Sequence, residues 1–241
     1  MTIFSLMSVG WGQDCIDGVE VELWGWCYNI EETTSLNPSY EFTQGQVIPP
    51  GIGQLINLDE LQLENMGLIG EIPPEIGNLT NLTHLWLNNN QLSGEIPPEI
   101  GNLTNLNVFW SYNNQLSGEI PSSIGNLTNL YDFRLSNNQL TGEIPPEIGN
   151  MVNLNDFSLN HNQLSGEIPP EIGDITNLER IYLYDNQLTG EIPPEIGNLT
   201  NLRWLYLNDN QLTGSFPDEI CFDGNDVQLN NNQLCPPYPD C

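Results

Sequence analysis

The chain has 241 residues, of which 38% are hydrophobic, enough for one elongated domain. Its 3 Lys+Arg stand against 32 Asp+Glu, giving a formal net charge of -29, and Lys is absent altogether. Such a surface repels polyanions, which excludes nucleic acid as a partner, and no apolar run approaches the roughly 20 residues of a membrane span.

The chain begins with an apolar segment, MTIFSLMSVGWGQ, that lacks acidic residues. We interpret residues 1–14 as the remnant of a secretory signal peptide, with a buried first strand as the alternative. The cysteines also favour export, because all five lie outside the repeated part of the chain, where disulfides would close the ends of the domain in an oxidising compartment. We predict that Cys15 pairs with Cys27.

Residues 15–51 are predicted to form an N-terminal cap that includes a degenerate repeat. Residues 19–24, VEVELW, alternate between apolar and polar as an edge strand does, and their charges would discourage end-to-end pairing. Residues 35–37 and 47–50 resemble a damaged row, with Pro38 where a strand leucine belongs.

Residues 52–219 repeat one 24-residue row seven times, with IGNLTNLTHLWLNNNQLSGEIPPE at 76–99 as an example. A fixed period of this length predicts a solenoid. One row cannot bury its own apolar side chains, but stacked rows share one long core in which each row contacts only its neighbours.

The middle of each row has the two-residue period of a strand. Leu85 and Leu87 alternate with His84 and Trp86, which predicts one buried face and one solvent-exposed face.

The second half of the row is rich in Gly and Pro. Asn90 ends the main strand, and Gly94 allows a tight bend before Glu95 and Ile96, which we predict to form a second short strand. Two prolines then force a turn, and residues 97–103 are too short for more than a single helical turn.

The pattern LxxLxLxxNxLxGxIPxxIGNLxxL resembles the plant-type extracellular leucine-rich repeat of receptor-kinase ectodomains, polygalacturonase-inhibiting proteins and bacterial secreted proteins. The resemblance implies an α/β, mostly β, solenoid: a superhelix with a parallel concave sheet, short second strands and 3-10 turns on the convex side. It says little about function, because such proteins share a scaffold and differ in what they bind.

Residues 220–241 are predicted to form a C-terminal cap. Their segment NNQLCPPYPDC resembles the C-terminal cap of polygalacturonase-inhibiting proteins, which implies a disulfide between Cys235 and Cys241. Cys221 is then left over, and it competes for either of these two cysteines.

Columns that are alike in every row indicate scaffold. An Asn column at the strand exit is expected to satisfy backbone groups, and because Met66 takes that place in the first row, this ladder should start one row later. The Glu columns beside the prolines indicate a solvated face, with loose divalent-cation binding as the alternative. The NLT sequons are either glycan acceptors or part of the turn chemistry. These sequons lie at Asn78, Asn81, Asn102, Asn126 and Asn198.

The outward positions of the main strands vary from row to row and hold every Arg and His of the chain. Exposed aromatic residues beside arginine have the composition of binding hot spots, and stacked rows would place cations over rings. The candidate binding residues are His84, Trp86, Trp110, Tyr112, Tyr131, Arg134, Arg180, Tyr182, Tyr184, Arg203, Trp204 and Tyr206.

The sequence does not point to an enzyme. His84 and His161 lie three rows apart, about 14 Å by the strand spacing, too far to cooperate in catalysis, and no cofactor or metal motif is present. We therefore predict a secreted, monomeric, non-enzymatic module that binds a protein or peptide partner through its concave face. The alternatives are glycan binding at the same face, with Asn88, Asn89 and two aspartates bonding hydroxyls, and a structural or adhesive surface that meets a mineral, ice or neighbouring cells.

Overall fold

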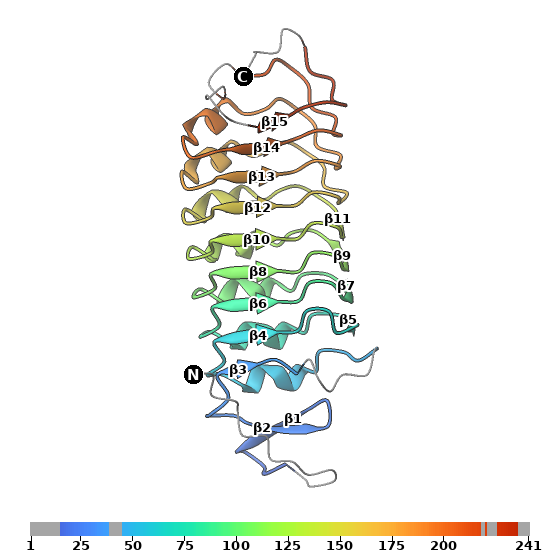
Figure 1. The fold of residues 1–241 in the computed structure, drawn as a ribbon, viewed down its shortest axis with the longest axis vertical. Helices are drawn as coiled ribbons and strands as arrows, with labels where there is room; N and C mark the ends of the chain where they lie inside the picture. Colours follow the sequence, from blue (N-terminus) through green and yellow to red (C-terminus); the bar gives the residue numbers. More distant parts are fainter. Residues whose placement is uncertain (1–14, 39–44, 218–219, 221–225, 236–241) are drawn as a thin grey trace.

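Each repeated row adds one strand to a nine-stranded parallel sheet in the computed structural model, which describes residues 15–38, 45–217, 220 and 226–235 (Figure 1). The sheet runs from β3 near the N-terminal end of the stack to β15 near its C-terminal end. Its strands are β3 (Ser35–Leu36), β4 (Glu60–Gln62), β6 (His84–Trp86), β8 (Val108–Trp110), β10 (Asp132–Arg134), β12 (Asp156–Ser158), β13 (Arg180–Tyr182), β14 (Trp204–Tyr206) and β15 (Asp226–Gln228).

The register of this sheet aligns equivalent positions of successive rows. Leu85 pairs with Phe109, and Trp86 pairs with Trp110, with the same offset from strand to strand. Side chains of one sequence column therefore stack above one another along the whole sheet. This confirms the predicted solenoid.

The inward columns form one continuous core. Leu85 and Leu87 are fully buried, and the rings of Phe109, Phe133 and Phe157 stack at centroid distances of 5.7 and 6.1 Å. Ser111 takes a leucine position and is also fully buried.

A second, four-stranded parallel sheet lies in the other half of the rows. Its strands are β5 (Ile69–Gly70), β7 (Gln91–Gly94), β9 (Gln115–Gly118) and β11 (Gln139–Leu140). The prediction of a second strand at Glu95–Ile96 is therefore wrong, because the strand of this row ends at Gly94, although the equivalent Glu167 and Glu191 of later rows form isolated β-bridges. The main-chain N of Gln91 already donates to the O of Leu68 in the preceding row at 2.7 Å, and Gly94, at φ +79°, turns the chain out of the extended conformation.

Short 3-10 helices occupy the predicted helical turns. Most have Pro at the first position, where its missing N–H costs nothing. Successive turns pack so closely that a Cβ on Gly77 would lie 2.4 Å from the main-chain O of Glu99. The helices are η1 (Pro50–Gln54), η2 (Pro74–Asn78), η3 (Pro98–Asn102), η4 (Ser122–Asn126), η5 (Pro146–Asn150), η6 (Pro170–Asp174) and η7 (Pro194–Asn198).

The Asn column at the strand exit satisfies main-chain groups, as predicted. The Nδ2 of Asn114 donates to the O of Leu87 in the preceding row and to the O of Ser111 in its own row, at 3.0 and 3.2 Å. Its Oδ1 accepts from the N of Leu92 at 3.0 Å. The ladder begins at Asn90, one row after the first, as expected from the methionine in that row.

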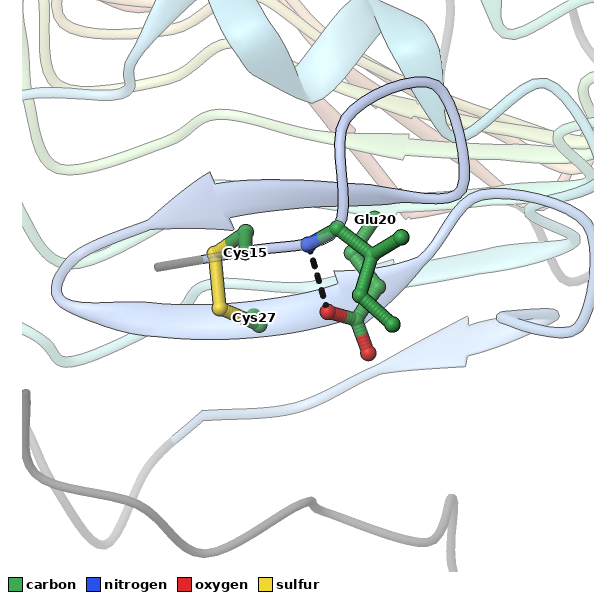
Figure 2. The surroundings of a disulfide bond; sticks show 4 residues. Cys15, Glu20 and Cys27 are labelled. Carbon is green, nitrogen blue, oxygen red and sulfur yellow. Dashed lines mark hydrogen bonds between the residues drawn. A yellow bond between two sulfur atoms is a disulfide. The ribbon is translucent and has the colours of Figure 1, made fainter. Parts of the chain in front are cut away.

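The N-terminal cap is an antiparallel hairpin of β1 (Glu20–Leu23) and β2 (Trp26–Asn29). The predicted strand in residues 19–24 is confirmed. Figure 2 shows the predicted disulfide between Cys15 and Cys27, whose Cα atoms are 5.5 Å apart. The main-chain N of Ile16 donates to the Glu20 carboxylate at 3.0 Å.

At the C-terminal end, Asn232 continues the Asn ladder by donating to the O of Leu207 at 2.9 Å. Cys235 is an exposed free cysteine in the structure, so the predicted Cys235–Cys241 disulfide is not formed there; Cys221 and Cys241 themselves lie outside the described residues. The predicted signal-peptide remnant, residues 1–14, also lies outside them. In the part of the chain that the structure describes, no helix is long and apolar enough to cross a membrane.

Candidate binding surface

The outward side chains of strands β4 to β14 form one continuous surface, which we call the sheet face. Strand pairing places His84 beside Val108 and Trp86 beside Trp110, and continues in this register to Tyr182 beside Tyr206. The predicted separation of inward and outward columns is therefore present. It brings most of the candidate residues onto one surface.

The first aromatic cluster lies on β6, on β8 and just after β8, and it consists of His84, Trp86, Trp110 and Tyr112. The ring of Trp86 lies 5.1 Å from that of His84 and 6.0 Å from that of Trp110, and Tyr112 lies 6.3 Å from Trp110. The ten outward positions of these two rows hold no acidic residue and no Arg. This part of the sheet face therefore adds no negative charge to a strongly acidic protein.

Charged side chains occupy the centre of the sheet face. The guanidinium of Arg134 donates from Nε to the Asp132 carboxylate at 2.7 Å, and from Nη2 to the same carboxylate at 2.9 Å. Nη2 also donates to Oδ2 of Asp156 on the next strand at 3.0 Å. Arg134 lies over the ring of Trp110 at 5.1 Å, which confirms the predicted cation-π contact and joins the charged centre to the first aromatic cluster.

Burial acts differently on the two sides of this ion pair. Asp156 is only 4% exposed, so loss of hydration raises the pKa of its carboxyl, although a hydrogen bond from Ser158 and the charge of Arg134 act against that rise. For Arg134 the loss of hydration lowers the pKa, but the two aspartates outweigh it and the net shift is upward. The guanidinium is therefore firmly charged, and the Asp156 carboxylate is stabilised first by the Ser158 hydroxyl and then by the guanidinium.

The second aromatic cluster lies on β13, just after β13 and on β14, and it consists of Tyr182, Tyr184, Trp204 and Tyr206. Tyr206 is 5.0 Å from Tyr182 and 6.3 Å from Tyr184 by ring centroids. Arg180 lies over the Trp204 ring at 4.6 Å, and its Nη1 is 4.0 Å from Asp156. The expected contact between an arginine and an aromatic ring is thus present at Arg180 and Trp204.

Tyr206 has a hydrogen-bonded hydroxyl at the far end of this cluster. The hydroxyl donates to Oδ2 of Asp226 at 2.5 Å. This bond to the neutral phenol raises the pKa of Tyr206 to about 12.

Several outward positions are less accessible than the sequence suggested. Asp132 and Asp156 are 7% and 4% exposed because Arg134 covers them, and Asn88 is 4% exposed. The expectation that Asn88 bonds the hydroxyls of a ligand is wrong for this reason. Tyr131 and Arg203 directly precede β10 and β14 and lie at the edge of the sheet.

The fifth outward position of each row has a backbone role that the sequence reasoning missed. This column, which includes Asn89, His161 and Asp185, has φ near +55 to +60°. Asn, Asp and His are the non-Gly residues that tolerate this left-handed conformation best. His161 therefore has a structural reason for its place, and its Nδ1 lies 2.5 Å from the Asp185 carboxylate.

A second Asn ladder was also missed. Asn81 donates to the O of Ile56 at 2.9 Å, and Asn105 donates to the O of Thr80 at 2.8 Å, each reaching the preceding row just before the main strand. The column holds Asn in all seven rows, and this uniformity was the signal that indicated scaffold. The Asn81 sequon lies in this ladder, so a glycan there would compete with a row-to-row hydrogen bond.

The chemistry of the sheet face is that of noncovalent binding. It offers aromatic rings, two arginines and hydroxyl groups on rigid strands. Throughout the described ranges, no group of three or more His, Cys, Asp or Glu residues is placed to hold a metal ion.

Family models match most of the repeats. A leucine-rich repeat model matches residues 81–103, 102–127, 129–151 and 153–175, and a model of two leucine-rich repeats matches residues 176–218. Comparison with curated protein sequences finds no match.

Solved structures of plant proteins share the fold. The ectodomain of the receptor kinase GASSHO1/SCHENGEN3 from Arabidopsis thaliana, solved with CASPARIAN STRIP INTEGRITY FACTOR 2, is 38% identical with a TM-score of 0.79, and the match covers 83% of this chain and 24% of that one. The plant peptide hormone receptor RGFR1, in complex with RGF2, is 43% identical with a TM-score of 0.79, over 83% of this chain and 32% of that one. This chain thus spans about a quarter to a third of these receptors.

A third similar structure is closer in length. A plant ice-binding protein is 26% identical with a TM-score of 0.66, and the match covers 86% of this chain and 74% of that one. The repeats, the parallel sheet and the family models agree with one another, and the chain belongs to the leucine-rich repeat family.

Proposed function

We propose that this chain is a secreted, non-enzymatic module that binds an extended peptide segment, free or part of a protein, across its sheet face. The observation that carries the proposal is the order of side chains along the stack. An aromatic cluster without acidic residues at Trp110 and a tyrosine-rich cluster at Trp204 flank a charged centre in which Arg134 and Arg180 meet buried aspartates.

The spacing of the two clusters suits an extended chain. Trp110 and Trp204 lie four rows apart, which is about 19 Å at the usual strand spacing. An extended peptide of roughly six residues covers that distance. Its apolar side chains would pack on the aromatic rings, and its main-chain groups would meet the tyrosine hydroxyls.

Charge supports the same surface. The chain carries a net charge of -29, yet all three arginines lie on or beside the sheet face and the first aromatic cluster adds no negative charge. A partner therefore meets less negative charge here than the overall composition implies. Rigid aromatic residues beside arginine are also the groups that contribute most to binding free energy in known interfaces.

The similar receptors support a peptide partner. The solved complexes of plant receptor ectodomains hold peptide hormones, and they share the repeat and the fold with this chain. Export is supported by the Cys15–Cys27 disulfide and by the extracellular setting of these ectodomains.

The test is selection of ligands from a random peptide library on the oxidised chain, followed by calorimetric titration of the selected peptides. We expect Trp110→Ala and Tyr206→Ala each to weaken binding by about 2 kcal/mol, the threshold of a hot spot. Glu99→Ala, on the first turn of η3, is the matched control and should bind like the wild type. The proposal fails if no peptide is selected, or if the control loses as much affinity as the two aromatic variants.

A second candidate function is contact with ice. The plant ice-binding protein matches over most of its length, and an exposed Thr column runs along the loops before the main strands. Thermal hysteresis measured on the wild type and on Thr104→Tyr with Thr128→Tyr tests this candidate. Activity that the double variant abolishes would support it, and absence of activity in the wild type would end it. The exposed threonines are Thr80, Thr104, Thr128, Thr176 and Thr200.

A further inference from the structure

A groove with a volume of about 400 Å³ lies at the edge where the strands of the large sheet begin. It spans the loops that lead into strands β10 to β14. In Figure 1 these loops follow one another along one side of the stack. No member of the two aromatic clusters lines it. The lining residues are Tyr131, Asn153, Asn155, Asn177, Glu179 and Asn201.

Three of these asparagines present oriented acceptor atoms. The Nδ2 of Asn153 donates to the O of Thr128 at 2.8 Å, and Asn177 and Asn201 make the same bond to their preceding rows at 2.8 and 2.9 Å. A carbonyl oxygen only accepts, so the amide nitrogen must face it and Oδ1 must point the other way. Each Oδ1 thus remains an acceptor to which no described side chain donates. One such atom recurs in each row, about every 4.8 Å.

Tyr131 supplies an apolar wall. It is 54% exposed, and it is the only aromatic residue in its sequence column, whose other members are Asp59, Thr83, Asn107, Asn155, Glu179 and Arg203. An exposed ring at this place has no role in the core. Its face is free to pack against the C–H groups of a ligand.

The charge of the groove is nearly balanced. Glu179 is the only charged lining residue, and its Oε2 lies 3.9 Å from Nη2 of Arg180. Asn155 is occupied, since its Oδ1 accepts from Arg180 and its Nδ2 donates to the O of Asn177, both at 3.3 Å. A cationic ligand therefore gains little binding free energy in this groove, and a ligand with many hydroxyl donors gains the most.

From this geometry we propose that the groove binds a neutral oligosaccharide. The sugar hydroxyls donate to the Oδ1 atoms of Asn153, Asn177 and Asn201, and the apolar face of one ring packs on Tyr131. The sugar chain runs along the stack, so that successive units meet successive rows. This site is separate from the peptide surface proposed above, and both ligands can bind at the same time.

An array of neutral oligosaccharides probed with the oxidised chain tests the proposal, followed by calorimetric titration of the best binder. We expect Tyr131→Ala to raise Kd at least tenfold. Asn177→Ala should raise it several-fold, whereas Asn105→Ala, which breaks the same kind of bond to Thr80 outside the groove, should leave it unchanged. Trp110→Ala should not affect the sugar, which separates this site from the peptide surface.

Absence of any neutral binder on the array overturns the proposal, and so does binding that survives Tyr131→Ala but is lost in Trp110→Ala. Competition by spermidine at low micromolar concentration would show a cation site instead. Tyr131 is exposed, so its variant reports on binding even if Asn177→Ala lowers the stability of its row.

Discussion

Nη2 of Arg134 lies 3.0 Å from Oδ2 of Asp156, a residue on the adjacent strand that is only 4% exposed. The same guanidinium holds Asp132 in a two-point contact. One arginine thus pairs with two nearly buried carboxylates between the aromatic clusters. The stability of the central rows and the binding proposed for the sheet face therefore involve the same side chain.

Arg134→Met tests the structural part of this arrangement. The variant leaves two carboxylates without their guanidinium partner, although Ser158 still donates to Asp156, and we expect the free energy of unfolding to fall by about 1–3 kcal/mol. Arg203→Met is the control, because Arg203 is exposed and makes no ion pair with any described residue. Chemical denaturation of both variants gives the comparison. Equal losses, or no loss in Arg134→Met, would contradict the role of the pair.

Asp156→Asn tests the raised pKa. Because the folded-state pKa of Asp156 lies above the ordinary 3.8, the folded protein binds more protons just above pH 3.8, and the wild type loses stability as the pH rises through this window. The variant lacks this loss, so its stability relative to the wild type should increase with pH.

Asp209→Asn provides the opposite case. Hydrogen bonds from Asn231 and Asn208 lower the pKa of Asp209, so its contribution is present above 3.8 and is lost as the pH falls through the lower folded-state value. Denaturant unfolding of the wild type, Asp156→Asn and Asp209→Asn at a series of pH values around 3.8 measures how the stability of each protein depends on pH. If the stability of both variants relative to the wild type changed with pH in the same direction, the opposite pKa shifts of Asp156 and Asp209 would be refuted.

Gly125→Ala tests the close stacking of the 3-10 turns. A Cβ there would lie 2.4 Å from the main-chain O of Glu147, so the backbone of one of the two turns must move. We expect the free energy of unfolding to fall by about 3 kcal/mol. Gly18→Ala is the control for backbone conformation alone, because Gly18 has φ +72° but nothing within 4 Å of the added atom. The free energy of unfolding of Gly18→Ala should fall by only about 1–2 kcal/mol. Thermal unfolding distinguishes the two, and a smaller loss in Gly125→Ala would disprove tight stacking.

Tyr206 should be among the last tyrosines to ionise. The hydroxyl hydrogen-bonds Asp226, which raises the pKa of Tyr206 to about 12. The stabilisation from this bond is present below pH 10 and is lost as the pH rises toward 12. Alkaline titration of tyrosinate absorbance, wild type against Asp226→Asn, should show one group that ionises earlier in the variant. Superimposable titration curves would rule out the bond.

Much of the fold was predictable because the seven rows act as controls for one another. The alternation around Leu85 and Leu87 predicted the main strands, and the column that begins at Asn90 predicted the buried ladder. The second strand was misplaced at Glu95. Its pairing with the preceding row begins at Gln91, directly after the Asn90 ladder, and the sequence pattern does not reveal this.

The candidate site was predictable as a surface but not in its details. Column analysis placed Trp86, Trp110 and Tyr206 on one face. It could not show that Arg134 folds back over Asp132, because a side-chain rotamer and not the strand register decides that contact. Nor did it separate residues that vary for recognition from those, like Asp185, that suit a left-handed backbone.

The central claim is that a peptide ligand lies across both aromatic clusters. The direct measurement is an NMR titration of the indole N–H signals with a selected peptide. We predict that the signals of Trp110 and Trp204 shift together at one affinity, whereas that of Trp24, whose Nε1 donates to the O of Val47 in the N-terminal cap, stays in place. Shifts at Trp24 with none at Trp110 and Trp204 would contradict the account.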